Sequence, residues 1–84
     1  MNFKQEELVK ELEKELKDRF PNVVINGYWE KGDSSIAIHV STPQDNAWEI
    51  AETMSPLSVD ILSKYGYLIY IVPVSRKESL MQAA

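Results

Sequence analysis

Hydrophobic residues recur every fourth position near the start of the chain and predict an amphipathic helix over residues 2–20. The stripe consists of Leu8, Leu12, Leu16 and Phe20. This spacing brings side chains to one face of a helix, and the Lys and Glu residues between them form a solvated outer face. Asn2 followed by Gln5 is typical of a capping box. Pro21 predicts the end of the helix, because a proline disfavours helical geometry at the residue before it.

The next two segments alternate between apolar and other residues and predict an antiparallel hairpin. They are NVVINGYWE, residues 22–30, and SIAIHV, residues 35–40. In the first segment, simple alternation places Ile25, Gly27 and Trp29 on one side of the strand. The link between the segments is short and contains Gly32, as in hairpin connections.

A second helical stripe runs from Ala47 to Tyr65, and Thr42 with Pro43 predicts the start of its helix. Gly66 has the character of the glycine that follows a helix. Pro56 interrupts the stripe. The helix is therefore either kinked at Pro56 or divided there into two helices.

The segment YLIYIVPV, residues 67–74, is apolar on both faces. This predicts a central strand that is covered on both sides, or partly covered by another chain. Ser75 and Glu78 form a capping-box pair that predicts a short C-terminal helix. The predicted fold is an α+β two-layer sandwich of order α-β-β-α-β, with a mixed three-stranded sheet, two main helices and a short C-terminal helix. It forms one domain over residues 1–84, with residues 75–84 as a tail.

Composition limits where this domain acts and what it binds. The chain of 84 residues contains no cysteine, which excludes disulfides and thiolate metal sites and suits a reducing cytoplasm. It has no apolar run of membrane-spanning length and no basic, apolar leader. The net charge of −4 argues against nucleic acid as a partner, since affinity for nucleic acid depends on cationic contacts to phosphate. We expect a cytoplasmic protein with a protein partner or a homo-oligomeric state.

Two stretches resemble the nucleotidyltransferase superfamily in its minimal bacterial form. The first is INGYWEKGDSSIAIHV, residues 25–40. In the family, a Gly-Ser turn is followed by a second glycine and then by Ser-Asp-hydrophobic-Asp on the next strand. Gly27 and Gly32 have the glycine spacing, and the segment from Ser34 overlays the strand after a deletion of a few loop residues. The second stretch, ILSKYGYLIYIVPVSRKESL, is similar to the end of the family's domain, so the resemblance covers nearly the whole chain.

The resemblance implies a metal site for which this chain lacks the carboxylates. In the family, two aspartates on the second strand hold the divalent metal that bridges the nucleotide phosphates. Ser35 and Ala37 stand at these positions, Tyr28 replaces the serine of the turn, and residues 67–74 contain no acid in place of the third carboxylate. We expect a degenerate site with no catalytic residue, no metal and no cofactor. Its positions are Gly27, Tyr28, Gly32, Ser34, Ser35 and Ala37.

Other side chains could rebuild a metal site or form an interface. Four acids and a histidine lie near the hairpin and the following helix: Glu30, Asp33, Asp45, Glu49 and His39. Turn chemistry and helix dipoles favour acids at such places without any function. Most of the aromatic residues are expected to pack in the core, while the remainder fit the aromatic enrichment of protein interfaces. The candidate interface residues are Trp29, Trp48, Tyr67 and Tyr70.

These observations leave three hypotheses for function. The first is a catalytically inactive nucleotidyltransferase-like domain that acts through protein–protein interaction or self-association. The second is a Mg²⁺-dependent nucleotide-binding or nucleotidyl-transfer protein whose ligands are displaced. The third is a KH-like nucleic-acid-binding domain, although the break at ETMSPLSVD, residues 52–60, has no glycine and carries acids.

Overall fold

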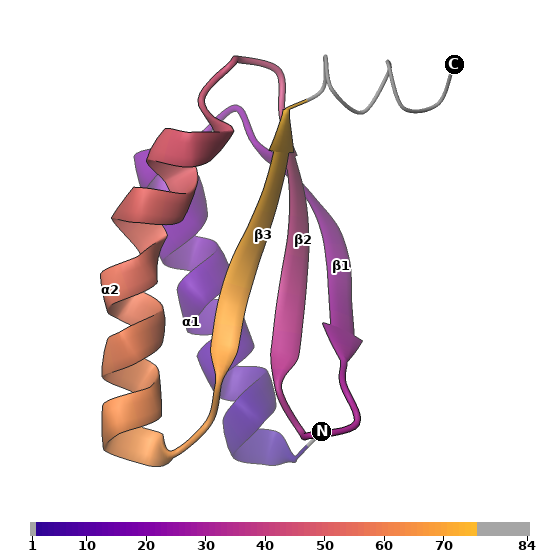
Figure 1. Cartoon of the computed structure of the whole chain (residues 1–84), viewed down its shortest axis with the longest axis vertical. Helices are drawn as coiled ribbons and strands as arrows, with labels where there is room; N and C mark the ends of the chain where they lie inside the picture. Colours follow the sequence, from indigo (N-terminus) through magenta and orange to yellow (C-terminus); the bar gives the residue numbers. More distant parts are fainter. Residues whose placement is uncertain (1, 76–84) are drawn as a thin grey trace.

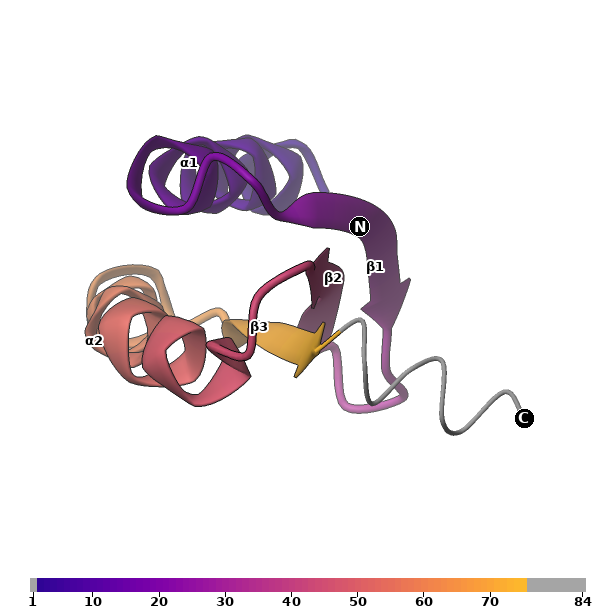
Figure 2. The ribbon, with the colours of Figure 1, turned by 90° about the horizontal axis from the view of Figure 1, so that it is seen from above.

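A computed structural model describes residues 2–75 of the chain and shows two helices packed on one three-stranded sheet (Figure 1). The elements in chain order are α1 (Phe3–Arg19), β1 (Val24–Glu30), β2 (Ile36–Thr42), α2 (Ala47–Tyr65) and β3 (Ile69–Ser75). The helices form one layer and the strands form the other (Figure 2). The predicted α+β sandwich is therefore confirmed. Of the predicted C-terminal helix only the capping residue Ser75 is described, where it ends β3; the rest of that prediction lies outside the described residues.

Helix α1 begins and ends where its sequence predicts. The Gln5 N–H donates to Asn2 Oδ1 at 2.8 Å, and the Asn2 N–H donates to Gln5 Oε1 at 3.0 Å, which completes the predicted capping box. At the other end Phe20 is the C-cap and its N–H donates to the Leu16 carbonyl at 2.8 Å. The helix thus satisfies backbone groups that its ends would otherwise leave unpaired.

The sheet has the strand order β1-β2-β3, so β2 is the central strand. Strands β1 and β2 are antiparallel, which confirms the predicted hairpin, and β2 and β3 are parallel. The prediction that residues 67–74 form a central strand was wrong. The strand is apolar on both sides because Ile69 and Ile71 pack in the core, while Tyr70 and Val72 lie on the opposite face. Pro73 fits an edge, where a strand does not need every N–H for pairing.

A β-bulge in β1 changes which of its side chains face the helices. Ile25 pairs with Val40, but the register then shifts so that Gly27 pairs with His39 and Trp29 with Ala37. Because Val40 and Ala37 project from opposite faces of β2, Ile25 and Trp29 do as well. The predicted placement of Ile25 and Trp29 on one side of the strand was therefore wrong.

Helix α2 begins later than the sequence predicts and is not divided. Thr42 is buried at the end of β2, where it pairs with Ser75, so it does not cap the helix. The N-cap is Asn46, and its side chain accepts a hydrogen bond from the Thr42 hydroxyl. Pro56 lies inside the continuous helix, and Gly66 follows it in the predicted left-handed conformation with φ of 76°.

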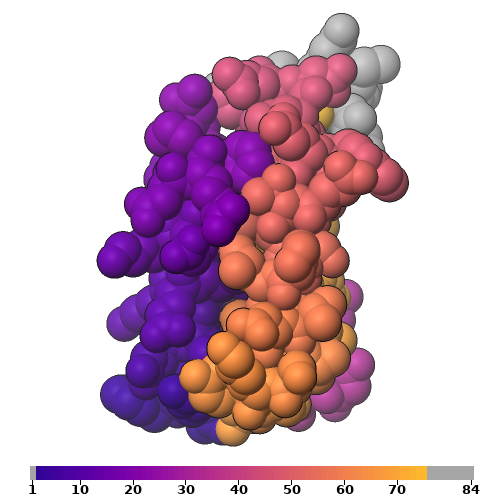
Figure 3. Space-filling view, turned by 90° about the vertical axis from the view of Figure 1, so that its left-hand side faces the viewer, coloured from indigo at the N-terminus to yellow at the C-terminus, as the bar shows by residue number. Residues whose placement is uncertain are grey.

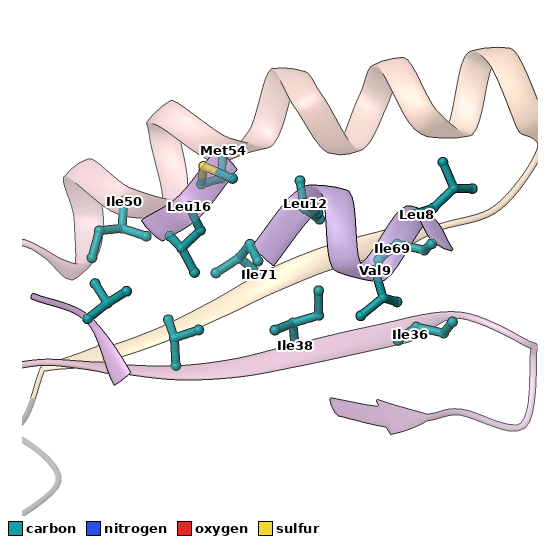
Figure 4. Close-up of a cluster of buried hydrophobic side chains, with 12 residues drawn as sticks. Leu8, Val9, Leu12, Leu16, Ile36, Ile38, Ile50, Met54, Ile69 and Ile71 are labelled. Atoms are coloured by element: carbon teal, nitrogen blue, oxygen red, sulfur yellow. The ribbon is translucent and has the colours of Figure 1, made fainter. Parts of the chain in front are cut away.

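The core lies between the helix layer and one face of the sheet (Figure 4). It is formed entirely by aliphatic residues and methionine: Leu8, Val9, Leu12, Leu16, Val23, Ile36, Ile38, Val40, Ile50, Met54, Ile69 and Ile71. On the outside of this layer the two helices run side by side (Figure 3). A shallow groove of about 180 Å³ lies between them. The opposite face of the sheet contributes no residue to this core.

Candidate functional site

The face of the sheet that neither helix covers carries uncharged residues, most of them apolar or aromatic. We call it the open face; the pairing register defines its members, except Asn26, which lies in the bulge and is placed there by the hydrogen bond that its Nδ2 donates to the Ser41 hydroxyl at 2.7 Å. They are Val24, Asn26 and Trp29 of β1, Ala37, His39 and Ser41 of β2, and Tyr70, Val72 and Val74 of β3. None of them is charged. The helix layer lies on the other side of the sheet (Figure 2).

Ala37 lies at the centre of the open face between two aromatic residues. It pairs with Trp29 on one neighbouring strand and with Tyr70 on the other. Ala37 is only 1% exposed, whereas Trp29 is 66% exposed. The position that would carry a metal-binding aspartate in the resembled family is therefore a buried methyl group between aromatic residues.

His39 is the other member of the open face with unusual surroundings. Its ring centroid lies 4.2 Å from that of Trp29, with the ring planes tilted by 46°. Its Nε2 atom is buried and has no hydrogen-bond partner within the described part of the chain. A buried polar atom without a partner costs about 1–3 kcal/mol. The open face thus includes a hydrogen-bonding atom to which no residue among 2–75 donates and from which none accepts.

The two residues that correspond to the Gly-Ser turn of the resembled family do not form a turn here. Gly27 and Tyr28 lie inside β1, where Gly27 has a φ of 127° beside the bulge. Tyr28 pairs with Ile38 and lines a shallow hollow with residues of α1 such as Val9. Its side chain therefore lies on the helix side of the sheet, away from Ala37.

The remaining degenerate-site positions form the hairpin turn. Ser34 occupies the left-handed region with φ of 71°, while Gly32 does not. Ser35 is buried, and both its hydroxyl and its N–H donate to Asp33 Oδ1, at 2.7 and 3.0 Å. The hydrogen bond from the Ser35 hydroxyl is the main cause that holds the pKa of Asp33 below its ordinary value, and the bond from the Ser35 N–H adds to it. The Ser35 side chain therefore serves to stabilise the turn.

The acids near the hairpin and the second helix are spread over both ends of β2. Asp33 precedes this seven-residue strand and Asp45 follows it, a separation of about 20 Å along the strand. Glu49 lies further on, in the first turn of α2. Across residues 2–75, no group of three or more His, Asp or Glu side chains is placed to hold a metal ion.

Of the four aromatic interface candidates, the structure brings two together. Trp29 and Tyr70 flank Ala37 on the open face. Tyr67 instead packs against the core, and its hydroxyl accepts a hydrogen bond from Asn2 Nδ2 at 3.1 Å. Trp48 is 77% exposed and stands apart on α2.

Sequence reasoning missed two open-face residues of β3, Val72 and Val74, and did not connect His39 with Trp29. The alternation of the β2 residues indicates that His39 lies on the same face as Ala37. The contact between His39 and Trp29 could be predicted only by knowing where the bulge in β1 lies.

No helix in the part of the chain that the structure describes is long and apolar enough to cross a membrane. Three comparisons with known proteins found no matching family model, no matching curated protein and no matching solved structure for this chain.

Proposed function

We propose that this chain is a catalytically inactive, nucleotidyltransferase-like small domain that acts through protein–protein interaction, and that it binds its partner with the open face. The observation that carries the proposal is the row formed by Trp29, Ala37 and Tyr70 across three strands. Trp29 at 66% exposure presents apolar surface on the order of 100–150 Å². Exposed aromatic residues in an uncharged patch are typical of the centres of protein interfaces.

The same row supports the inactive part of the proposal. A divalent cation such as Mg²⁺ needs oxygen ligands, and Ala37 offers none. Ser35, at the other carboxylate position, already gives its hydroxyl hydrogen to Asp33. Tyr28 lies on the opposite side of the sheet from Ala37. The positions that would cooperate in the resembled family therefore point in different directions in this chain.

The interaction is tested by placing a photo-crosslinking benzoylphenylalanine at position 29 in cells that produce the protein. A matched control carries it at position 3, where Phe3 is an exposed aromatic residue on α1. We expect a protein adduct from position 29 only. The captured protein, once purified, should bind the Trp29→Ala variant at least about tenfold more weakly than the unchanged chain. An adduct of doubled mass would identify the partner as a second copy.

Different results would support the two other hypotheses, nucleotide binding and nucleic-acid binding. Shifts around Gly27–His39 in an NMR titration with Mg²⁺ and ATP would replace the proposal with nucleotide binding. Nucleic-acid adducts from position 29, or a gel shift at low salt, would replace it with base stacking on Trp29 and Tyr70. No cationic side chain lies on the open face to support the latter.

A further inference from the structure

Helix α2 carries a second set of apolar residues on its outer side, away from the core. Trp48, Val59 and Leu62 are 77%, 61% and 44% exposed. Since successive residues of a helix are about 100° apart, these three lie with Ala51 and Ser55 within roughly a quarter of the helix circumference. We call these five residues the outer stripe. Figures 1 and 2 both show α2 at the margin of the domain, with α1 and β3 on its inner side.

The outer stripe repeats along the helix, unlike the single exposed apolar residues that are ordinary on a protein surface. Trp48, Ser55 and Leu62 are spaced by seven residues, with Ala51 and Val59 between them. A seven-residue repeat of this kind is the pattern by which one helix packs against another. A broad hollow of about 490 Å³ is lined by Ala51 and Ser55 as well as by Trp48. The stripe therefore has large side chains towards its ends and room for the side chains of a neighbour in between.

The outer stripe is complementary to itself when two copies of α2 run antiparallel. With Ser55 on a two-fold axis, residues equally distant from Ser55 in the sequence face each other across the contact. Trp48 then faces Leu62 of the second copy, and Val59 of the second copy enters the hollow at Ala51. A parallel pair would instead set Trp48 against Trp48 and Ala51 against Ala51, which would leave the hollow empty.

We infer that two copies of the chain associate through the outer stripe, as an antiparallel pair of α2 helices related by a two-fold axis through Ser55. The small residues at the centre allow the helix axes to approach to about 8 Å, the short end of the usual range. A second copy is the occupant that fits, because one sequence supplies both the hollow and the side chain that fills it. This inference goes beyond the proposed function, since the open face lies on the sheet and the outer stripe on α2.

The charges on α2 permit this contact although each copy has a net charge of −4. Glu52 is the one charged residue among those that line the hollow. It lies three residues before Ser55, so the two copies of Glu52 are separated by about 9 Å along the helix axes. This exceeds the screening length of about 8 Å at physiological ionic strength. The repulsion between the two carboxylates is therefore weak in such a buffer and stronger at low salt.

The area of the contact predicts a weak and reversible dimer. The three large apolar side chains of the outer stripe, counted over two copies, present on the order of 600–700 Å². Stable protein interfaces bury about 1,200–2,000 Å² in total. We therefore expect a monomer that exchanges with the dimer, with a dissociation constant on the order of 10–100 μM.

Single cysteines can test the position of the axis, because the chain has no cysteine of its own. We expect Ser55→Cys to form a disulfide-linked dimer under mild oxidation at least about tenfold faster than Ser63→Cys, because a disulfide needs Cα atoms within about 7 Å. The matched control Ser63 is an exposed serine of the same helix that would lie about 24 Å from its own copy along the axes.

Sedimentation of the chain without cysteine measures the strength of the same contact. Trp48→Ala should weaken the dimer at least about tenfold, because it removes the largest side chain of the outer stripe. Trp29→Ala makes the same change on the open face and should leave the dimer unchanged. Lowering the salt concentration should weaken the dimer through Glu52.

Four results would overturn the inference. One is a monomer at concentrations about tenfold above the expected dissociation constant. Another is an equal rate of disulfide formation in Ser55→Cys and Ser63→Cys. A dimer that Trp29→Ala abolishes and Trp48→Ala does not would assign self-association to the open face. A photo-crosslinking residue at position 48 that captures only another protein would assign the outer stripe to that partner. Because Trp29 and Trp48 lie on separate surfaces, this inference and the proposed function fail independently.

Discussion

The indole of Trp29 lies against the imidazole of His39, with ring centroids 4.2 Å apart, although the two residues are not direct partners in the sheet. Trp29 pairs with Ala37, and His39 pairs with Gly27. Because Gly27 has no side chain, no neighbour on β1 separates the imidazole from the indole. The contact joins a strongly exposed ring to a residue whose Nε2 atom is buried and without a hydrogen-bond partner in the described part of the chain.

Replacing His39 should show whether this atom costs stability in the isolated domain. We expect His39→Leu to raise the free energy of unfolding by about 1 kcal/mol, because it removes an unpartnered buried polar atom. His39→Gln is the control, since it keeps polar atoms at the position and should bring no such gain. Urea unfolding measures both variants. A loss of stability in His39→Leu would mean that the imidazole makes a contact in solution that offsets its burial.

Placing a carboxylate at Ala37, as the resembled family has there, should damage the fold. Ala37 is 1% exposed, so we expect Ala37→Asp to lower the free energy of unfolding by about 3 kcal/mol or more. Ser34→Asp adds the same charge to the exposed hairpin turn, where aspartate tolerates the left-handed conformation. It should cost less than about 0.5 kcal/mol. An Ala37→Asp variant that stayed stable and bound Mg²⁺ would show that position 37 opens into a usable site.

The elements of the fold were predictable because they depend on local patterns. Three of these patterns act within a few residues, and each was confirmed: the four-residue spacing of Leu8, Leu12 and Leu16, the capping box at Asn2, and the helix end at Gly66. The order of elements then gave the α+β sandwich. Thr42 was misread because its capping chemistry competes with its place in the ladder beside Ser75. That competition depends on a strand more than thirty residues away.

Two glycines of the hairpin should respond in opposite directions to alanine. Gly27 has a φ of 127°, while an added Cβ would meet no atom within 4 Å at either Gly27 or Gly32. Backbone conformation alone therefore distinguishes them. We expect Gly27→Ala to cost about 1–3 kcal/mol, and Gly32→Ala to be neutral or to stabilise by up to about 1 kcal/mol. Thermal unfolding measures the pair, and equal effects would contradict the backbone explanation.

The turn at Asp33 should make a small pH-dependent contribution to stability. The Ser35 hydroxyl and N–H lower the pKa of Asp33 in the folded state, so the contribution is complete above the unfolded pKa. It is lost as the pH falls through the lower folded pKa. Ser35→Ala removes the hydroxyl donor and should raise the pKa of Asp33, while the N–H donor at 3.0 Å remains. An NMR titration of the Asp33 carboxyl carbon measures this, and an unchanged pKa would contradict it.

The candidate site was less predictable than the fold because it depends on register. The sequence identified Trp29, Ala37 and Tyr70 as separate candidates, but their meeting in one row requires the pairing of three strands. Strand β3 was expected at the centre of the sheet because apolar residues on both faces do not distinguish a central strand from an edge beside an uncovered surface.

The bulge at Asn26 lets β1 contain one residue more than regular pairing with β2 requires. Before the bulge the strand packs Ile25 into the interior, and after it the strand displays Trp29. Loss of Asn26 would restore unbroken alternation and keep every printed pair, so Ile25 would still face the helices and Trp29 would still face outward. The loss of a single codon at this point would therefore remove the bulge without changing the aromatic residue that the domain shows to the outside.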